Sequence, residues 1–330
     1  MEKSGGEIKK AAFAGSWYPE SPEECTRNIG KFLQEGREKI LNGPFSGGVV
    51  PHAGWYFSGS IACGVIASIA AYPLLSGRNV NAVVIFGMHM NPDSRPCVMV
   101  NSGWRTPLGE LFVHGELAQS FAKKVDIRQD SPLGFPQDNT IELQLPFVKY
   151  FFKDAAILPV GVPPSEQAEI MGNTVVASAR ELGLNIVVLA STDMTHYGDN
   201  FGFSPAGSGT RALKWVTDYN DRGAIETMTS MDPGAIISHG LANRSMCCAG
   251  AAAAAVSAAR EMGAVGGVEF DYATSYDKSP GESFVGYSGI LFSHYRLAKF
   301  TPCVRDSCGL KRQGTRKQTK VINKCTPSRP

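Results

Sequence analysis

The sequence contains few signals for export or membrane insertion. We predict no membrane span, because we find no apolar run that supplies the roughly 20 predominantly apolar residues such a span needs. Residues 1–20 lack the apolar core of a secretion signal. The eight cysteines are spaced too irregularly for the disulfide framework of a secreted protein. We therefore expect a cytoplasmic protein with mostly reduced cysteines and no membrane partner.

Charge is also sparse, at 19% of residues, and the chain has no regular repeat. This composition argues against a coiled-coil or disordered protein and suits a globular chain with many short turns. No linker divides residues 1–300, which we predict to form one domain. Residues 301–330 hold eight Lys or Arg against one acidic residue. We interpret them as a basic, solvated and disordered tail, and we expect no specific nucleic-acid partner.

What the sequence does contain is an alternation of strand and helix patterns. Short β-branched blocks at 48–50, 82–87, 155–161 and 185–190 are separated by helical segments. Two closing strands, at 268–276 and 284–292, are predicted to be antiparallel because their connection is too short for a crossover. The pattern predicts an α/β fold: a single domain with a central mixed, largely parallel sheet flanked by helices. Other expected elements are a helix from Ser21 to about Ile40, one from Ser58 to Tyr72, one capped by Asp138 or Asn139, and a turn-rich segment at Trp104–Gly109.

Three of the predicted strands end in a histidine or an acid. His52 and His89 each follow a strand, and a third strand is followed by Asp193 and His196. In open α/β sheets ligands collect outside the carboxyl ends of the strands, so these side chains are expected to converge. The three-residue step between Asp193 and His196 lets the carboxylate orient the imidazole, which suits an acid–base pair.

Cys247 and Cys248 lie at the amino end of an alanine-rich helix, where the helix dipole favours a thiolate. Two histidines and one thiolate or carboxylate would leave open positions on a metal ion, as sites that bind substrate or oxygen require. Without a metal, the same residues could form a cysteine nucleophile with a histidine base. The residues alone leave both readings open.

Several ordered motifs together resemble the Memo-like family, whose bacterial and archaeal members are called AmmeMemoRadiSam system protein B. The resemblance runs from about Ala11 to Phe292. The motifs are GSWYP at Gly15, PHAG at Pro51, the segment Val83–His89, TPLG at Thr106, DNTIELQLP at Asp138, STDMTHYG at Ser191 and MCCAG at Met246. The resemblance implies the fold of the class III extradiol dioxygenases.

The resemblance also implies a site. His52, His89 and Cys247 match the family's metal positions, and Asp193 and His196 match its acid–histidine pair. We expect Fe(II) in this site, with Cu or Zn as alternatives, and a dioxygenase-like or redox reaction on an unidentified small-molecule or peptide substrate. Association with radical-SAM system proteins is a further implication of the resemblance.

A second hypothesis is a non-catalytic module that binds a peptide, a phosphopeptide or another anion in the same pocket. Aromatic and arginine side chains are common interface anchors. We assign substrate or ligand binding to the aromatic rim, a nearby arginine and a motif glutamate, namely Trp17, Tyr18, Trp55, Arg105 and Glu142. A third hypothesis is a metal-independent cysteine hydrolase, which thiol alkylation would inactivate and chelators would not. The substrate and the oligomeric state stay open.

Overall fold

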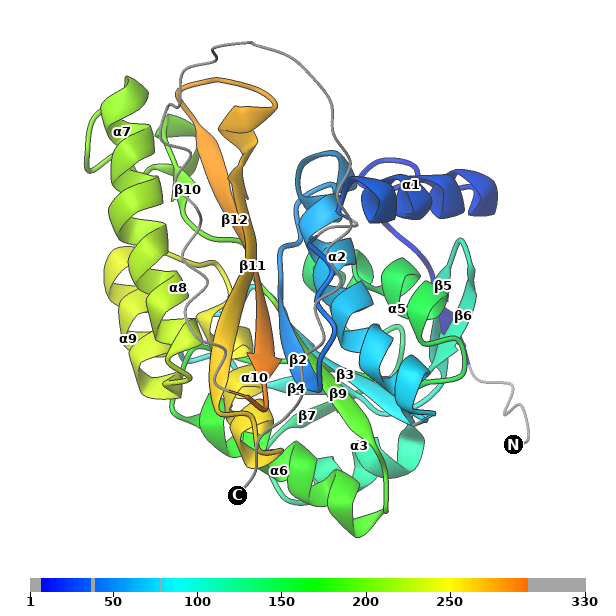
Figure 1. The fold of residues 1–330 in the computed structure, drawn as a ribbon. Coiled ribbons are helices and arrows are strands. Elements are labelled where there is room, and N and C mark those ends of the chain that lie inside the picture. The colour runs from blue at the N-terminus through cyan, green and yellow to red at the C-terminus, as the bar shows by residue number, and fades with distance from the viewer. Residues whose placement is uncertain (1–6, 37–38, 78, 296–330) are drawn as a thin grey trace, which may run out of the picture. The chain divides into compact units, whose positions relative to one another are not determined.

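The computed structural model describes residues 7–36, 39–77 and 79–295. They form an α/β domain around a nine-stranded mixed sheet, with a three-stranded sheet beside it (Figure 1). The large sheet has the order β10 (His196–Tyr197), β12 (Phe284–Ser293), β2 (Phe45–Val50), β9 (Ile186–Ser191), β3 (Ala82–Gly87), β8 (Ala156–Gly161), β4 (Cys97–Met99) and β7 (Arg128–Asp130), and β11 (Gly266–Thr274) also pairs with β12. The small sheet has the order β1 (Ile8–Lys9), β5 (Gly103–Thr106) and β6 (Gly109–Phe112). The α/β fold class is confirmed.

Four central strands of the large sheet, β2, β9, β3 and β8, run parallel. Their residues are almost all buried, because helices cover a parallel sheet on both faces, and this explains their continuous apolar sequences. β11 and β12 form the predicted antiparallel pair, and β12 joins the parallel strands by pairing antiparallel with β2. The carboxyl ends of β2, β9 and β3 therefore lie next to one another at one edge of the sheet.

The helices are α1 (Pro22–Glu35), α2 (Trp55–Ser76), α3 (Gly115–Ala122), α4 (Asn139–Glu142), α5 (Leu145–Phe151), α6 (Gln167–Glu181), α7 (Gly209–Trp215), α8 (Asp221–Thr229), α9 (Pro233–Asn243) and α10 (Ala249–Glu261), with a π-helical turn at Val216–Asn220. The alanine run of α10 permits very close packing against α6. A side chain on Gly172 of α6 would come within 2.2 Å of the Ala254 carbonyl oxygen. Small residues thus let α6 pack closely on α10, which contacts β9, β2 and β3.

The expectation that no run is long and apolar enough to span a membrane is wrong. The segment Trp55–Pro73 of α2 is long and apolar enough to cross a membrane, because it carries no charged residue. Its small and hydroxylated residues interrupt the apolar pattern along the chain. In the fold, 72% of this segment is buried, and α2 packs against β2, β11 and β12 as a core helix does.

Two local predictions also need correction. Ser21 caps α1 as expected, by accepting a hydrogen bond from the Glu24 backbone N–H, but the helix ends at Glu35 because Gly36 follows it. The turn-rich segment at Trp104–Gly109 belongs to the β5–β6 hairpin, whose Trp104 is fully buried. The predicted tail, residues 301–330, lies outside the described residues, so the domain boundary at residue 300 stays a prediction.

Candidate metal centre

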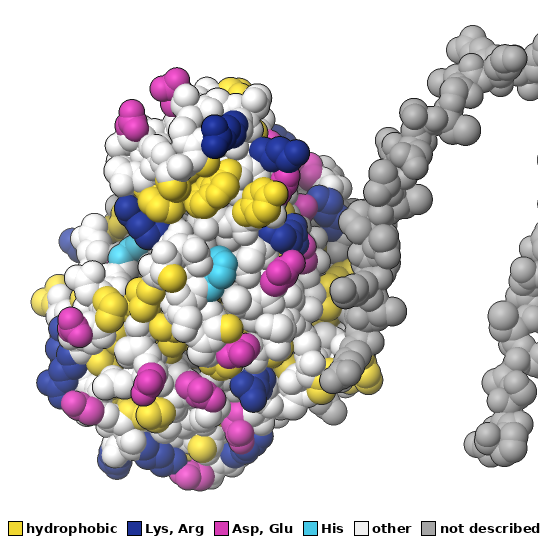
Figure 2. Space-filling model, turned by 90° about the vertical axis from the view of Figure 1, so that its left-hand side faces the viewer, with side chains coloured by type: hydrophobic (Ala, Val, Ile, Leu, Met, Phe, Trp, Pro, Cys, Tyr) yellow, Lys and Arg dark blue, Asp and Glu magenta, His cyan; other side chains and the backbone are white. Residues whose placement is uncertain are grey.

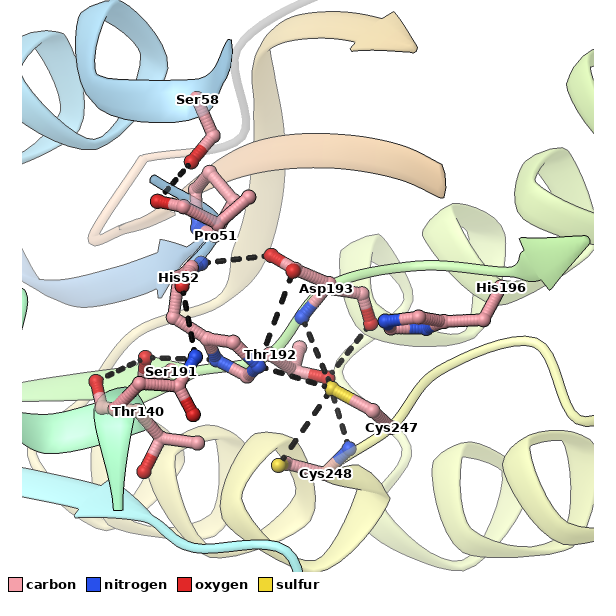
Figure 3. A network of polar contacts seen from close by, with 12 residues as sticks. Pro51, His52, Ser58, Thr140, Ser191, Thr192, Asp193, His196, Cys247 and Cys248 are labelled. Atoms are coloured by element: carbon pink, nitrogen blue, oxygen red, sulfur yellow. Dashed lines mark hydrogen bonds and ion pairs between the residues drawn. The ribbon is translucent and has the colours of Figure 1, made fainter. Parts of the chain in front are cut away.

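The carboxyl edge of the parallel strands brings the predicted ligands together. His52 lies two residues beyond β2, His89 two residues beyond β3, and Cys247 immediately precedes the residue that caps α10. One potential ligand atom from each of His52, His89, Cys247 and Cys248 lies within 4.8 Å of the others. These four residues are called the cluster below. Figure 3 shows the sulfur atom of Cys247 between the imidazole of His52 and the side chain of Cys248. This arrangement has the chemistry of a transition-metal site.

The hydrogen bonds around His52 determine which ring nitrogen is available. The Ser191 hydroxyl donates its hydrogen to the Thr140 carbonyl oxygen at 2.6 Å, so it can only accept from His52 Nδ1, 3.2 Å away. His52 therefore carries a hydrogen on Nδ1 and directs Nε2 toward Cys247 Sγ, at 3.2 Å. A metal-binding histidine is commonly held in this way, with one nitrogen donating to a neighbour and the other facing the ion.

His89 is held in the same manner by a carboxylate. Its Nδ1 lies 3.0 Å from Asp138 Oδ2, and its backbone N–H also donates to that oxygen. Asp138 in turn caps α4 through the Thr140 backbone N–H. Burial by itself would lower the pKa of His89, but the hydrogen bond to Asp138 and the nearby Cys247 sulfur raise it to about 10. His89 Nε2 is thus the nitrogen left for the cluster.

The turn before His89 is strained. Met88 adopts a φ of 78°, which is rare for a residue other than glycine, and its N–H donates to the Thr140 hydroxyl. A side chain on Gly87 would come within 2.6 Å of that same hydroxyl oxygen. The short Gly87–Met88 turn therefore aims His89 back across the end of β3.

The two adjacent cysteines have opposite protonation tendencies. Burial alone would raise the pKa of Cys247, but its contact with the Cys248 thiol and the charge of His52 lower it well below its ordinary value. Burial and the neighbouring Cys247 sulfur raise the pKa of Cys248 well above its ordinary value. The Asp193 backbone N–H also donates to Cys247 Sγ at 3.3 Å. Cys247 is thus prepared as the thiolate and Cys248 as a neutral thiol.

Asp193 and His196 lie near the cluster without forming the predicted pair. Asp193 Oδ1 accepts from the His52 backbone N–H at 2.7 Å, and burial raises the pKa of its carboxyl group. His196 Nδ1 faces the Met194 carbonyl oxygen, and its ring packs edge-on against Phe201. Among the described residues no hydrogen bond joins Asp193 to His196. Residues 192–195 form no helical turn, so the three-residue spacing does not place the two side chains on one face.

A cavity of about 410 Å³ opens in front of the cluster. His89, His196 and Cys247 contribute to its wall, and the rest of the wall comes mainly from the end of α9 and from Phe201. Seen from the side of α7–α9, histidine side chains reach the surface beside hydrophobic and basic ones (Figure 2). A molecule in this cavity would lie next to the cluster.

The five residues predicted to bind substrate do not line this cavity. Trp17, Tyr18 and Trp55 line a different cavity of about 690 Å³, beside α1. Tyr18 is buried and donates to Glu142 Oε1, which also accepts from the Phe13 backbone N–H.

Trp55 stacks on Phe147 and donates to the Leu143 carbonyl oxygen. Arg105 is exposed on β5 and pairs with Glu110. Tyr18, Trp55 and Glu142 are therefore held in contacts away from the cavity at the cluster, and their role in binding a substrate stays a prediction.

Two further residues contribute to the site. Cys248, which the sequence places beside Cys247 at the start of the helix, completes the group of potential ligands. Arg244 lines the cavity, and no local pattern marks it, because it ends a helix of ordinary composition.

Comparison with known proteins agrees with the motifs. A family model described as Memo-like protein matches residues 9–291. The chain belongs to the Memo-like family. A MEMO1 family protein of Thermococcus kodakarensis is 31% identical over 304 residues, which cover 86% of this chain and 99% of that relative. Another from Methanopyrus kandleri is 32% identical over 296 residues, covering 86% and 98%.

A more distant likeness links this Memo-like chain to a solved structure, that of an uncharacterized protein from Escherichia coli K12. The TM-score is 0.43 and the identity 13%, over 64% of this chain and 86% of that chain. The predicted relation to extradiol dioxygenases stays a prediction.

Proposed function

We propose that this Memo-like protein binds a single redox-active metal ion through His52, His89 and Cys247 and uses it in an oxygen-dependent or redox reaction on a small molecule. The proposal favours Fe(II), with Cu and Zn as the alternatives that metal analysis would distinguish. A cytoplasmic location and association with radical-SAM system proteins belong to the same proposal and rest on family resemblance.

One observation carries the proposal: the ligand atoms converge within 4.8 Å, and both imidazoles present their remaining nitrogen to the cluster. Polar side chains that came together by chance would not each have a hydrogen-bond partner, here Ser191 and Asp138, that turns the ring toward the cluster. A thiolate ligand favours softer and redox-active ions over magnesium. The residues therefore fit a transition metal.

The number of ligands bears on the type of site. If Cys248 stays a neutral thiol, three protein ligands leave coordination positions open, as catalytic sites do. If Cys248 also binds, two sulfurs and two nitrogens would make the closed set typical of zinc. Cys247 lines the cavity, whereas Cys248 is buried and is not among its lining residues, which favours the open set.

The other residues near the cluster hold its ligands in position or exchange protons with a bound molecule. Ser191 and Asp138 hold the two imidazoles in their orientation, and Asp193 holds the backbone of His52. His196 lines the cavity with its ring and is the group we assign to donate or accept a proton there. When bound, the metal would supply a Lewis acid and an electron donor or acceptor.

Metal loading of the full-length protein tests the proposal. Protein purified without oxygen is mixed separately with Fe(II), Cu(I) or Zn(II), freed of excess metal and analysed by mass spectrometry. We expect an equimolar amount of metal in the wild type and strong loss in His52→Ala and Cys247→Ala.

The matched controls are His114→Asn, which keeps the acceptor that caps α3, and Cys63→Ala, which lies within α2. Both should bind metal as the wild type does. Metal contents that are equally substoichiometric in the wild type and in both ligand variants would refute the proposal. Because nitrogen and sulfur sites generally bind Zn(II) more tightly than Fe(II), relative affinity does not assign the metal. Zinc alone in protein purified without added metal would refute the assignment of a redox metal.

A further inference from the structure

The cavity in front of the cluster has an unusual distribution of charge. Its wall is largely apolar, with Phe201, Leu241 and Met246 among its residues. Among the described residues that line it, Arg244 is the only Lys or Arg, and none is an Asp or Glu. A cavity of about 410 Å³ lies within the range of small-molecule sites, which typically combine apolar walls with a few polar groups.

The guanidinium of Arg244 is held in place without being neutralised. Nη1 donates to the Gly202 carbonyl oxygen and Nη2 to the Phe201 carbonyl oxygen, each at 3.2 Å. The group also lies over the Phe203 ring, 4.7 Å from its centre. In the described part of the chain Arg244 forms no ion pair with a carboxylate. Since arginine has five N–H donors, donors remain for a ligand.

The backbone at Arg244 adds a second observation. Arg244 ends α9 with a φ of 48°, in the left-handed region that glycine or asparagine usually occupies at this position. Such strain is retained where the surrounding structure holds the residue in place. Here the left-handed turn joins α9 to the segment that carries Cys247 and lets the side chain reach the loop at Phe201.

We infer that the cavity binds an organic monoanion with an aromatic or similarly apolar body, and that Arg244 is the residue that binds its carboxylate. Arginine pairs with carboxylates through two parallel hydrogen bonds. The single guanidinium of the described lining matches one carboxylate, and the imidazoles of His89 and His196 are the other groups there that can carry positive charge. A dianion such as a phosphate ester is therefore the competing ligand, and phenyl phosphate tests the preference for a monoanion. The inference deepens the proposed function by naming the class of molecule beside the metal, but anion binding itself does not need the metal.

Calorimetric titration of the full-length protein tests the inference with four probes. These are 3-phenylpropionate, its uncharged amide, propionate, which lacks the ring, and phenyl phosphate. We expect 3-phenylpropionate to bind best, and the amide to bind about tenfold more weakly or worse, because it loses a charged hydrogen-bonded pair. Propionate should also bind more weakly, because it cannot fill the apolar wall.

Three variants locate the site. Arg244→Gln should weaken 3-phenylpropionate binding about tenfold or more, whereas Arg27→Gln, an exposed residue of α1, should not. Leu241→Trp, at a partly exposed position of the cavity wall, should also weaken binding by filling the space. Thermal melting and metal content are measured on the same samples to show that Arg244→Gln remains folded and loaded.

Equal affinity for the acid and the amide, unchanged binding by Arg244→Gln, or no binding of 3-phenylpropionate at millimolar concentration would each overturn the inference. Tighter binding of phenyl phosphate would overturn the preference for a monoanion. If the wild type binds no metal but binds 3-phenylpropionate through Arg244, the proposed function fails and this inference stands.

Discussion

Two polar networks border the loop between β9 and β10. The polar atoms of the first lie at the wall of a cavity, whereas those of the second, within the described residues, bond only to one another. In the cluster, His52 Nε2 and Cys247 Sγ face one another at the wall of a cavity. In the second network, Asp221 accepts from the Thr195 backbone N–H and hydroxyl through Oδ1 and from the Tyr272 hydroxyl through Oδ2. The second network is the more deeply buried, since Thr195 and Asp221 are fully buried, whereas in the cluster His89 is exposed and Cys247 half-buried.

The second network is closed on itself. Asn220 donates to the Thr195 hydroxyl oxygen and to the Asn243 carbonyl oxygen, so it joins the helices to the loop. A side chain on Gly286 would come within 1.9 Å of Asp221 Oδ2, which leaves no space for a ligand. Burial of polar groups therefore does not by itself mark a functional site, whereas donor atoms that converge beside a cavity do mark one.

Removal of Asp221 should have the largest effect on stability. Asp221→Ala leaves the Thr195 N–H, the Thr195 hydroxyl and the Tyr272 hydroxyl without their acceptor, and each unpaired buried group costs about 1–3 kcal/mol. We expect the free energy of unfolding, measured in urea, to fall by about 3 kcal/mol or more. The metal content of the folded fraction should stay that of the wild type. A loss of metal at full stability would show that the two networks are not separate.

The same residue should make stability depend on pH. Burial raises the pKa of folded Asp221 to about 6, from an ordinary value of 3.8. Between these values the folded chain keeps a proton that the unfolded chain releases, so stability should decrease as pH rises from about 4 to about 6 and then level off. The difference of about two pKa units corresponds to about 3 kcal/mol.

The free energy of unfolding in urea is measured across this pH range for metal-free wild type and Asp221→Asn. The difference between the two proteins isolates the contribution of Asp221 from that of the cluster. Asp221→Asn should lack this decrease, because an amide does not titrate. Parallel pH profiles of the two proteins would contradict the prediction.

Loss of the carboxylate behind His89 should have an intermediate effect. Asp138→Asn retains an N-cap for α4, since asparagine caps helices well, but it removes the charge that orients His89. We expect metal affinity, measured by competition with a chromophoric chelator, to fall about 10–100-fold. Asp126→Asn, in an exposed ion pair with Arg95, is the control and should have no effect. Unaltered affinity in Asp138→Asn would mean that His89 is not a ligand.

The aromatic cavity beside α1 should give the smallest effect. Trp17 is 40% exposed and packs edge-on against Phe13, in a cavity that shares no lining residue with the one at the cluster. Trp17→Ala should change neither metal affinity nor 3-phenylpropionate binding beyond experimental error. Weaker binding of the metal or of 3-phenylpropionate would show that the two cavities act as one site, as the predicted aromatic rim requires.

Much of the fold could be predicted because its signals are local. The apolar blocks of β2, β3 and β9 mark buried strands, and Ser21 marks the start of α1 through the residues that follow it. The short strands were missed, because two or three residues, as in β10 and β4, show no periodicity. The predicted helix at Ser58–Tyr72 is shorter than α2 for a similar reason, since the glycines and serines of α2 interrupt the apolar pattern without ending the helix.

The candidate site could be predicted in part for the same reason. His52, His89 and Asp193 each follow a strand, and adjacent parallel strands lie about 4.8 Å apart, so their ends must be neighbours once the strands pair. The aromatic rim was a different case. Its members lie in or beside the GSWYP and PHAG motifs, but Tyr18 and Trp55 turn inward to pack and donate hydrogen bonds.

By itself the sequence determined the family, the strand ends that carry histidine, and the placement of Cys247 at the start of a helix, because each depends on residues next to one another in the chain. Only the tertiary structure decided which nitrogen of each imidazole faces the cluster, that Asp193 and His196 do not pair, and that Arg244 lines the cavity. These features depend on the order β2, β9, β3 in the sheet and on how α9 and α10 meet it. Contacts between distant segments arise from packing, and no local pattern encodes them.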